Sequence, residues 1–159
     1  MPCPKLPKCP TPSKHTEKGC IHWFYFGTNK AAKNMDQIHP CIIVGRNNLN
    51  SNRVLISPIT DIKNYIEGNP KKLKYPYHAA LYKRNYKFLD KDSVILLDQI
   101  FTVGKTELFE EWYLGTVTNT KEIDEALVYN FDLFESINST YIDLIKGFQT
   151  QYIKNYTRK

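Results

Sequence analysis

The stretch "HPCIIVGRNNLNSNRVLISPIT", residues 39–60, contains two apolar runs that are separated by a polar turn. The runs at residues 40–45 and 53–60 are rich in valine and isoleucine, which favour strands because their branched side chains fit a pleated surface. The intervening "NNLNSN", residues 47–52, consists mostly of residues that tolerate a positive φ angle. This order of runs and turn predicts two antiparallel strands.

A histidine and a proline stand at the entrance of this hairpin. Pro40 has no backbone N–H, and its ring biases His39 toward an extended conformation. The pair therefore predicts the rim of a strand. His39 is either an edge residue without chemistry or a titratable group that faces a ligand, since imidazole changes its charge near neutral pH.

Two further segments extend the predicted sheet. "CIHWFYFG", residues 20–27, alternates its side chains and is rich in aromatic residues, so it predicts a strand that begins an antiparallel meander. Val94 to Leu97 are consecutive apolar residues, which indicates a strand that is covered on both faces. Asp98 and Gln99 follow this strand and are expected at the end of the sheet.

The apolar period changes from two to about three and a half residues after Lys121, which predicts a C-terminal helix. One face of this helix would carry Ile123, Leu127, Phe131, Phe134, Ile137, Tyr141, Leu144 and Phe148. We expect a break near "SINST", residues 136–140. Because the opposite face is acidic, the stripe favours core or dimer contacts over membrane anchoring. The predicted fold is mainly β, a small antiparallel barrel with a C-terminal helix.

The chain of 159 residues fits one domain with tails. Residues 1–18 hold five of the nine prolines, so we predict a flexible Pro/Lys-rich arm that does not join the core. The domain itself is expected at residues 19–137, followed by a helical extension and basic tail at 138–159. No signal peptide opens the chain and no apolar run could span a bilayer, so we expect a soluble, cytoplasmic protein.

The net charge of +6 is unevenly distributed along the chain. Residues 20–91 carry twelve Lys and Arg against four Asp and Glu, whereas residues 92–153 carry three against eleven. A basic face of this kind can hold phosphates, which favours a nucleic acid as partner. The acidic half can equally be a solvated helix surface.

Four cysteines raise the question of a metal site. Cys3, Cys9, Cys20 and Cys41 lack the close CxxC pairing that is typical of structural zinc sites. We therefore expect no metal and no cofactor. Cys41, inside "CIIV", is interpreted as a small buried apolar residue.

Several blocks together resemble the MazF/PemK family of toxin endoribonucleases. The resemblance runs from about Lys18 to Phe134, and its most specific part is "DSVILLDQIFTVGK", residues 92–105. The other matching blocks are "KGCIHWFYFG", "HPCIIVGRNNLN", "SPITD", "KYPYHAALYKRNYKFLDK" and "EIDEALVYNFDLF".

The resemblance implies an SH3-like barrel that forms a homodimer and cleaves single-stranded RNA without metal. Cleavage would use the RNA 2′-hydroxyl as nucleophile, and a cognate antitoxin would restrain the toxin. The family's "PxT" motif is present as Pro58, Ile59 and Thr60, so the resemblance makes Thr60 the candidate that holds the scissile phosphate. Ser57, next to this motif, is an additional candidate without support from the family.

The chain departs from the family at two positions. His39 replaces the arginine of an Arg-Pro pair that serves the reacting phosphate, and Phe101 stands where the family often has an arginine. Histidine transfers protons more easily than arginine does, but while neutral it cannot replace a bidentate phosphate clamp. We therefore predict His39 and Thr60 as catalytic residues. The predicted RNA-binding residues are Lys30, Lys33, Arg46, Arg53, Ser57, Asp98 and Gln99.

Two alternatives remain open at this point. The missing arginines favour a non-catalytic toxin of the same fold, which would inhibit a target as CcdB-like toxins do. A ribonuclease toxin controlled by an RNA antitoxin is the other possibility. Cutting of single-stranded RNA in EDTA would separate the nuclease from the inhibitor.

Overall fold

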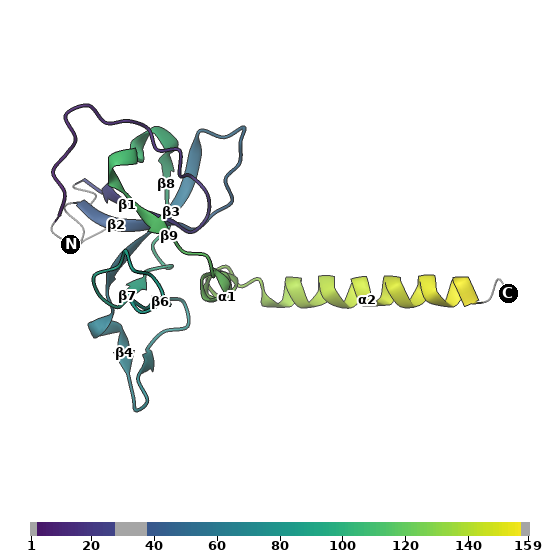
Figure 1. The fold of residues 1–159 in the computed structure, drawn as a ribbon. Helices are drawn as coiled ribbons and strands as arrows, with labels where there is room; N and C mark the ends of the chain where they lie inside the picture. Colours follow the sequence, from purple (N-terminus) through teal and green to yellow (C-terminus); the bar gives the residue numbers. More distant parts are fainter. Residues whose placement is uncertain (1–2, 28–37, 157–159) are drawn as a thin grey trace.

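The computed structural model describes residues 3–27 and 38–156. Its main sheet is curled and antiparallel, and its strands follow the order β6-β7-β3-β2-β1-β9, with β8 also paired to β3 (Figure 1). The strands are β1 (Cys20–Tyr25), β2 (Ile38–Ile43), β3 (Arg53–Asp61), β6 (Ala79–Leu81), β7 (Ser93–Ile95), β8 (Phe101–Gly104) and β9 (Tyr113–Thr116). The mainly antiparallel β architecture is as predicted.

The sheet is buried on both faces. Neighbouring residues of β2 point to opposite sides, so that Ile43 packs in one core cluster and Ile42 in the other. Strand β1 divides in the same way, with Phe24 in the first cluster and Ile21 in the second. The strands of the hairpin therefore carry apolar residues at consecutive positions, as a sheet covered on both faces requires.

Strand β3 is the longest strand and changes partners along its length. Its beginning pairs with β8, from Arg53 opposite Gly104, and its end pairs with β7, up to Asp61 opposite Ser93. Strand β7 thus lies between β3 and β6. The predicted burial of Val94 to Leu97 on both faces is confirmed, since all four residues are at most 3% exposed.

A lobe separates β3 from β7 in the chain. It contains η1 (Ile62–Tyr65), the short hairpin of β4 (Ile66–Glu67) and β5 (Lys72–Leu73), and strand β6. This hairpin projects from the body (Figure 1). A second connection, between β8 and β9, contains the 3-10 helices η2 (Lys105–Glu107) and η3 (Glu110–Trp112).

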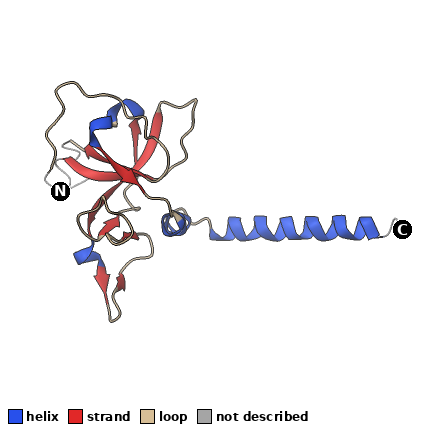
Figure 2. Cartoon of the chain, in the orientation of Figure 1, coloured by secondary structure: helices blue, strands red, loops and turns tan. Residues whose placement is uncertain are grey.

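Two helices end the chain. Helix α1 (Lys121–Asn130) packs on the barrel through Ile123 and Ala126, whereas α2 (Phe134–Tyr156) extends away from it (Figure 2). The expected break near residues 136–140 is wrong, because the chain turns earlier, at Asp132, whose φ angle is 52°. Among the α2 side chains whose burial the structure describes, the large exposed apolar ones are Phe134, Ile137, Tyr141, Ile142 and Leu144. Neither helix is long and apolar enough to cross a membrane.

The N-terminal segment lies against the barrel. The Thr11 carbonyl accepts a hydrogen bond from the Glu110 N–H at 2.8 Å, and the Ser13 N–H donates to the Leu108 carbonyl at 2.8 Å. Ser13 and Thr16 are buried. The expected separation of this arm from the core is therefore wrong for residues 11–16, because strand-like pairing with the η2–η3 connection satisfies their backbone groups.

Candidate functional site

The candidate site lies where β2 and β3 separate. Their pairing runs from Ile43 opposite Ile56 to Cys41 opposite Pro58 and ends there. Pro40 lacks a backbone N–H, so it cannot donate to β3 at this end of the ladder. The Pro58 carbonyl instead accepts from the Leu96 N–H, at the edge of β3 that faces β7.

A cavity of about 620 Å³ occupies the resulting space. Continuing the β2–β3 register places His39 opposite Thr60, with both side chains on one face of the sheet. Both residues line the cavity. The other lining residues are Cys3, Trp23, Ile38, Pro40, Ile59, Asp61, Leu89, Asp90, Lys91, Ser93 and Leu114.

Three charged residues line this cavity: Asp61, Asp90 and Lys91. The Lys91 ammonium lies 3.1 Å from Asp61 Oδ2, and the other Asp61 oxygen accepts from the backbone N–H of Lys63 at 2.9 Å. The Lys63 N–H and the Lys91 ammonium hold the pKa of Asp61 below its ordinary value. Asp61 therefore stays ionised and orients Lys91, which places a cation beside the site.

Lys91 was missed by the sequence analysis. It precedes β7, and the antiparallel register that sets Ser93 opposite Asp61 brings it to the end of β3. The pairing joins segments that lie about thirty residues apart in the sequence. The available signal was a lysine just before a predicted buried strand, which alone does not reveal the strand's partner.

His39 is half-buried in this cavity. Burial disfavours the imidazolium and lowers the pKa of His39 from its ordinary value of 6.5. The ring is therefore neutral at pH 7, with one nitrogen that can accept a proton. A neutral imidazole suits a general base and does not suit a phosphate clamp.

The predicted arginines lie elsewhere. Arg46 and Arg53 are exposed at the closed end of the β2–β3 hairpin, whereas His39 and Thr60 are at its open end. Arg53 and Thr60 are seven residues apart in one strand, about 23 Å at the usual rise of a strand. Neither arginine supplies the missing cation within this chain, because the hairpin carries them away from the cavity.

Three other predicted RNA-binding residues do not reach the cavity, and two cannot be placed. Ser57 is 0% exposed, so its interpretation as an RNA contact is wrong for this structure. Asp98 pairs with His78, and Gln99 sits in a turn in which its N–H donates to the Leu96 carbonyl. The two loop lysines, Lys30 and Lys33, lie outside the described residues.

The partner of Asp98 is a buried histidine that the sequence analysis did not single out. His78 Nε2 lies 3.0 Å from Asp98 Oδ1, and His78 is 7% exposed. Three tyrosine rings surround it, with centroids 4.6 to 5.7 Å from its own: Tyr65, Tyr75 and Tyr77. The pair therefore fixes a cluster of aromatic side chains.

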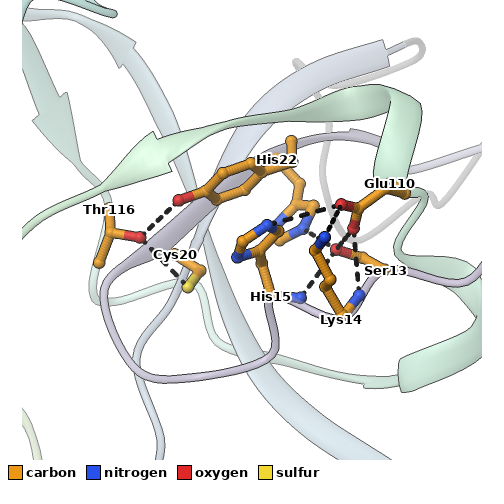
Figure 3. A network of polar contacts seen from close by, with 8 residues as sticks. Ser13, Lys14, His15, Cys20, His22, Glu110 and Thr116 are labelled. Carbon is orange, nitrogen blue, oxygen red and sulfur yellow. Dashed lines mark hydrogen bonds and ion pairs between the residues drawn. The ribbon is translucent and has the colours of Figure 1, made fainter.

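A second polar cluster joins the N-terminal segment to the barrel (Figure 3). The Ser13 hydroxyl donates to Glu110 Oε2 at 3.1 Å and lies 2.9 Å from His22 Nε2, which therefore donates to it. His15 stacks on the Tyr113 ring at 3.8 Å, and its Nε2 lies 3.5 Å from Glu110.

This cluster contains the types of side chain found in hydrolases but is closed to ligands. His22 is 0% exposed, and burial lowers its pKa to about 4. The Ser13 hydroxyl is also buried and already donates its proton to Glu110. We interpret the cluster as a structural clamp. Among residues 3–27 and 38–156, no group of three or more His, Cys, Asp or Glu side chains could hold a metal ion.

Comparisons with known proteins identify the family of this chain. A family model described as PemK-like, MazF-like toxin of type II toxin-antitoxin system matches residues 17–131. "Endoribonuclease MazF" of Staphylococcus epidermidis is 37% identical, over 62% of this chain and 82% of the relative.

Solved structures share the fold. An endoribonuclease from Mycobacterial species, in complex with its cognate antitoxin, aligns with a TM-score of 0.53 at 23% identity over 74% of this chain and 95% of that one. A second mycobacterial endoribonuclease gives a TM-score of 0.51 at 21% identity, over 73% and 90%. With residues 17–131 matched by the family model, the chain belongs to the PemK-like, MazF-like toxins of type II toxin-antitoxin systems.

Proposed function

We propose that the protein is a toxin endoribonuclease that cleaves single-stranded RNA, including messenger RNA in the cytoplasm, by attack of the 2′-hydroxyl and without a metal. The observation that carries this proposal is the shared cavity of His39, Thr60 and Lys91. A titratable base, a hydroxyl donor and a cation thus border one space that is large enough for a phosphodiester.

The roles follow from the environment of each side chain. His39, neutral because burial lowers its pKa, takes the proton of the attacking 2′-hydroxyl. Thr60 donates a hydrogen bond to a nonbridging phosphate oxygen, and Lys91 offsets the charge that develops on the phosphorane. The O2′–P bond forms as the P–O5′ bond breaks, and a proton returns to the 5′-oxygen. The products are a 2′,3′-cyclic phosphate and a 5′-hydroxyl.

Lys91 replaces the family's arginine in charge but not in position. Its ammonium is a compact point charge, whereas a guanidinium would bind two phosphate oxygens at once. The carboxylate of Asp61 pairs with it in the lining of the cavity. The residue roles therefore differ from those in an arginine-based site. The histidine transfers the proton, and the lysine offsets the negative charge.

We also propose a homodimer and a cognate antitoxin as partners. The exposed apolar side chains on α2, Phe134 at 73% and Tyr141 at 63%, are more than a monomer usually leaves to solvent. A mycobacterial neighbour was solved with its cognate antitoxin. Light scattering at micromolar concentration should give the mass of a dimer, and a monomer mass would remove this part of the proposal.

The test of the activity is incubation of the purified protein with a long single-stranded RNA in EDTA. We expect discrete cuts with 2′,3′-cyclic phosphate ends, and no cutting when the RNA carries 2′-O-methyl groups throughout. Cuts that require added metal would refute the mechanism. Intact RNA would favour a non-catalytic inhibitor of the same fold.

A further inference from the structure

The lobe between β3 and β7 concentrates positive charge. Its residues 62–91 carry eight Lys and Arg against two Asp and Glu, and Asp92 follows before β7 begins at Ser93. Lys71, Lys72 and Lys74 are exposed on or beside the projecting β4–β5 hairpin. Such a density of exposed lysines is typical of a surface that follows a phosphate backbone.

Aromatic residues lie between these charged residues in the sequence of the lobe. The rings of Tyr75 and Tyr77 stack with centroids 5.1 Å apart and an interplanar angle of 13°, and Tyr75 is 43% exposed. The lobe also contains Tyr82, whose ring lies 5.1 Å from the Arg84 guanidinium carbon. Exposed aromatic faces beside cations are the pattern with which proteins bind unpaired bases.

Two neighbouring residues, His78 and Asn130, contact the stacked pair. His78, buried and paired with Asp98, contacts the Tyr77 ring edge to face at a centroid distance of 4.6 Å. The Asn130 side chain on α1 donates to the Tyr77 carbonyl at 3.1 Å and to the Leu97 carbonyl at the same distance. The position of the pair is thus set before any ligand arrives.

The lobe is also continuous with the cavity. Its last residues, Leu89 to Lys91, line the space that contains His39 and Thr60. A strand of RNA whose phosphate sits in the cavity would therefore meet this segment directly beside the scissile position.

We propose that residues 62–91 form the RNA-binding lobe of this protein, with the stacked Tyr75–Tyr77 pair as a platform for an unpaired base. This inference rests on the proposed ribonuclease function and adds where the substrate is held. The lysines of the hairpin contact phosphates without regard to sequence, while the tyrosine pair requires a base that is free to stack.

The test is fluorescence anisotropy with an unstructured 2′-O-methyl oligonucleotide, which binds but offers no 2′-hydroxyl for attack. Tyr75→Ala should weaken binding about 5- to 100-fold, the usual effect of losing one base–aromatic stack. Tyr75→Phe should bind as the wild type does, because stacking needs the ring and not the hydroxyl. Leu49→Ala, at an 87% exposed position on the β2–β3 turn, is the control for loss of an exposed apolar side chain.

A duplex of the same length is the second probe, since paired bases cannot stack on the platform. Tyr75→Ala should leave duplex binding unchanged. The double variant Lys71→Gln/Lys72→Gln should instead weaken both probes and reduce the slope of log K against log salt by about 0.7 per lost contact on the single strand. Lys121→Gln, on α1, is the matched control for loss of an exposed charge.

Equal binding of the single strand by wild type and Tyr75→Ala would overturn the platform. Unchanged binding and salt slope in the lysine variant would overturn the lobe as the RNA surface and leave its charge for an acidic protein partner. These outcomes are independent of cleavage: a wild type that cuts RNA, together with a Tyr75→Ala variant that binds the single strand equally well, refutes the platform alone. Tyr75-dependent binding without cutting refutes the nuclease alone.

Discussion

His39 and His22 lie on neighbouring strands, and burial lowers the pKa of both, yet their surroundings give them opposite uses. His39 borders a cavity of about 620 Å³ that also holds Thr60 and Lys91. His22 is 0% exposed and is held by Ser13 and Glu110 in a closed cluster. A lowered pKa is therefore not enough to indicate catalysis, which also requires access to a substrate.

The largest expected effect concerns His39, the histidine that borders the cavity. His39→Ala removes the proposed general base and should reduce RNA cleavage about 10²- to 10⁴-fold, the usual contribution of such a group. The measurement is the initial rate on a single-stranded RNA. His22→Gln, in protein that is folded by circular dichroism, should cut at close to the wild-type rate. Equal losses in both variants would end the distinction between the two histidines.

Thr60→Ala should produce the next largest effect. Loss of one hydrogen-bond donor to a developing oxyanion typically costs about 10²- to 10³-fold in rate. Expression of this variant should no longer arrest growth, although the protein remains folded, because Thr60 is only half-buried. Thr60→Ser keeps the hydroxyl and is the control. Growth arrest by a folded Thr60→Ala protein would remove Thr60 from the site.

The closed cluster should dominate the dependence of stability on pH. His22 has a pKa of about 4 when folded and near 6.5 when unfolded, so the unfolded chain binds more protons between these values. The contribution of His22 to the free energy of unfolding is fully present above pH 6.5. It falls by about 3 kcal/mol as the pH drops toward 4. Urea unfolding at several pH values measures this change.

His39→Ala serves as the control for that experiment, because His39 also has a lowered pKa. Most of the fall between pH 6.5 and 4.5 should persist in His39→Ala and disappear in His22→Gln. The lowered pKa of Glu110, whose carboxylate accepts from the Lys14 backbone N–H and the Ser13 hydroxyl, adds its effect only below its ordinary value of 4.5. Stability that stays constant from pH 7 to 4.5 would contradict the assignment of His22.

Part of this architecture was accessible from the sequence. The hairpin of β2 and β3 follows from two β-branched runs and a turn of small polar residues, and burial of Val94 to Leu97 follows from four consecutive apolar side chains. The family resemblance suggested His39 and Thr60 as site residues, each from its own motif. Their shared cavity depends on where the β2–β3 ladder ends, which the position of Pro40 explains only once the register is known.

Other features depend on contacts between distant segments. Lys91 reaches the site through the register of β7 on β3, and Asp98 is engaged by His78, twenty residues earlier. The burial of Ser13 could not be predicted from the sequence, because a polar residue in a proline-rich segment is also typical of a solvated tail. The early end of α1 depends on the positive φ angle of Asp132, a residue type that occurs in both helices and turns.

The most direct test of His39 as the base is the pH dependence of kcat/KM for cleavage of a single-stranded RNA. A base acts when it is deprotonated, so the wild-type rate should rise with pH through an apparent pKa below 6.5 and be level by pH 7. His39→Arg, which restores the family residue, should lose this rise. A wild-type rate that does not rise with pH anywhere below pH 7, or an identical rise in His39→Arg, would contradict the role of His39 in proton transfer.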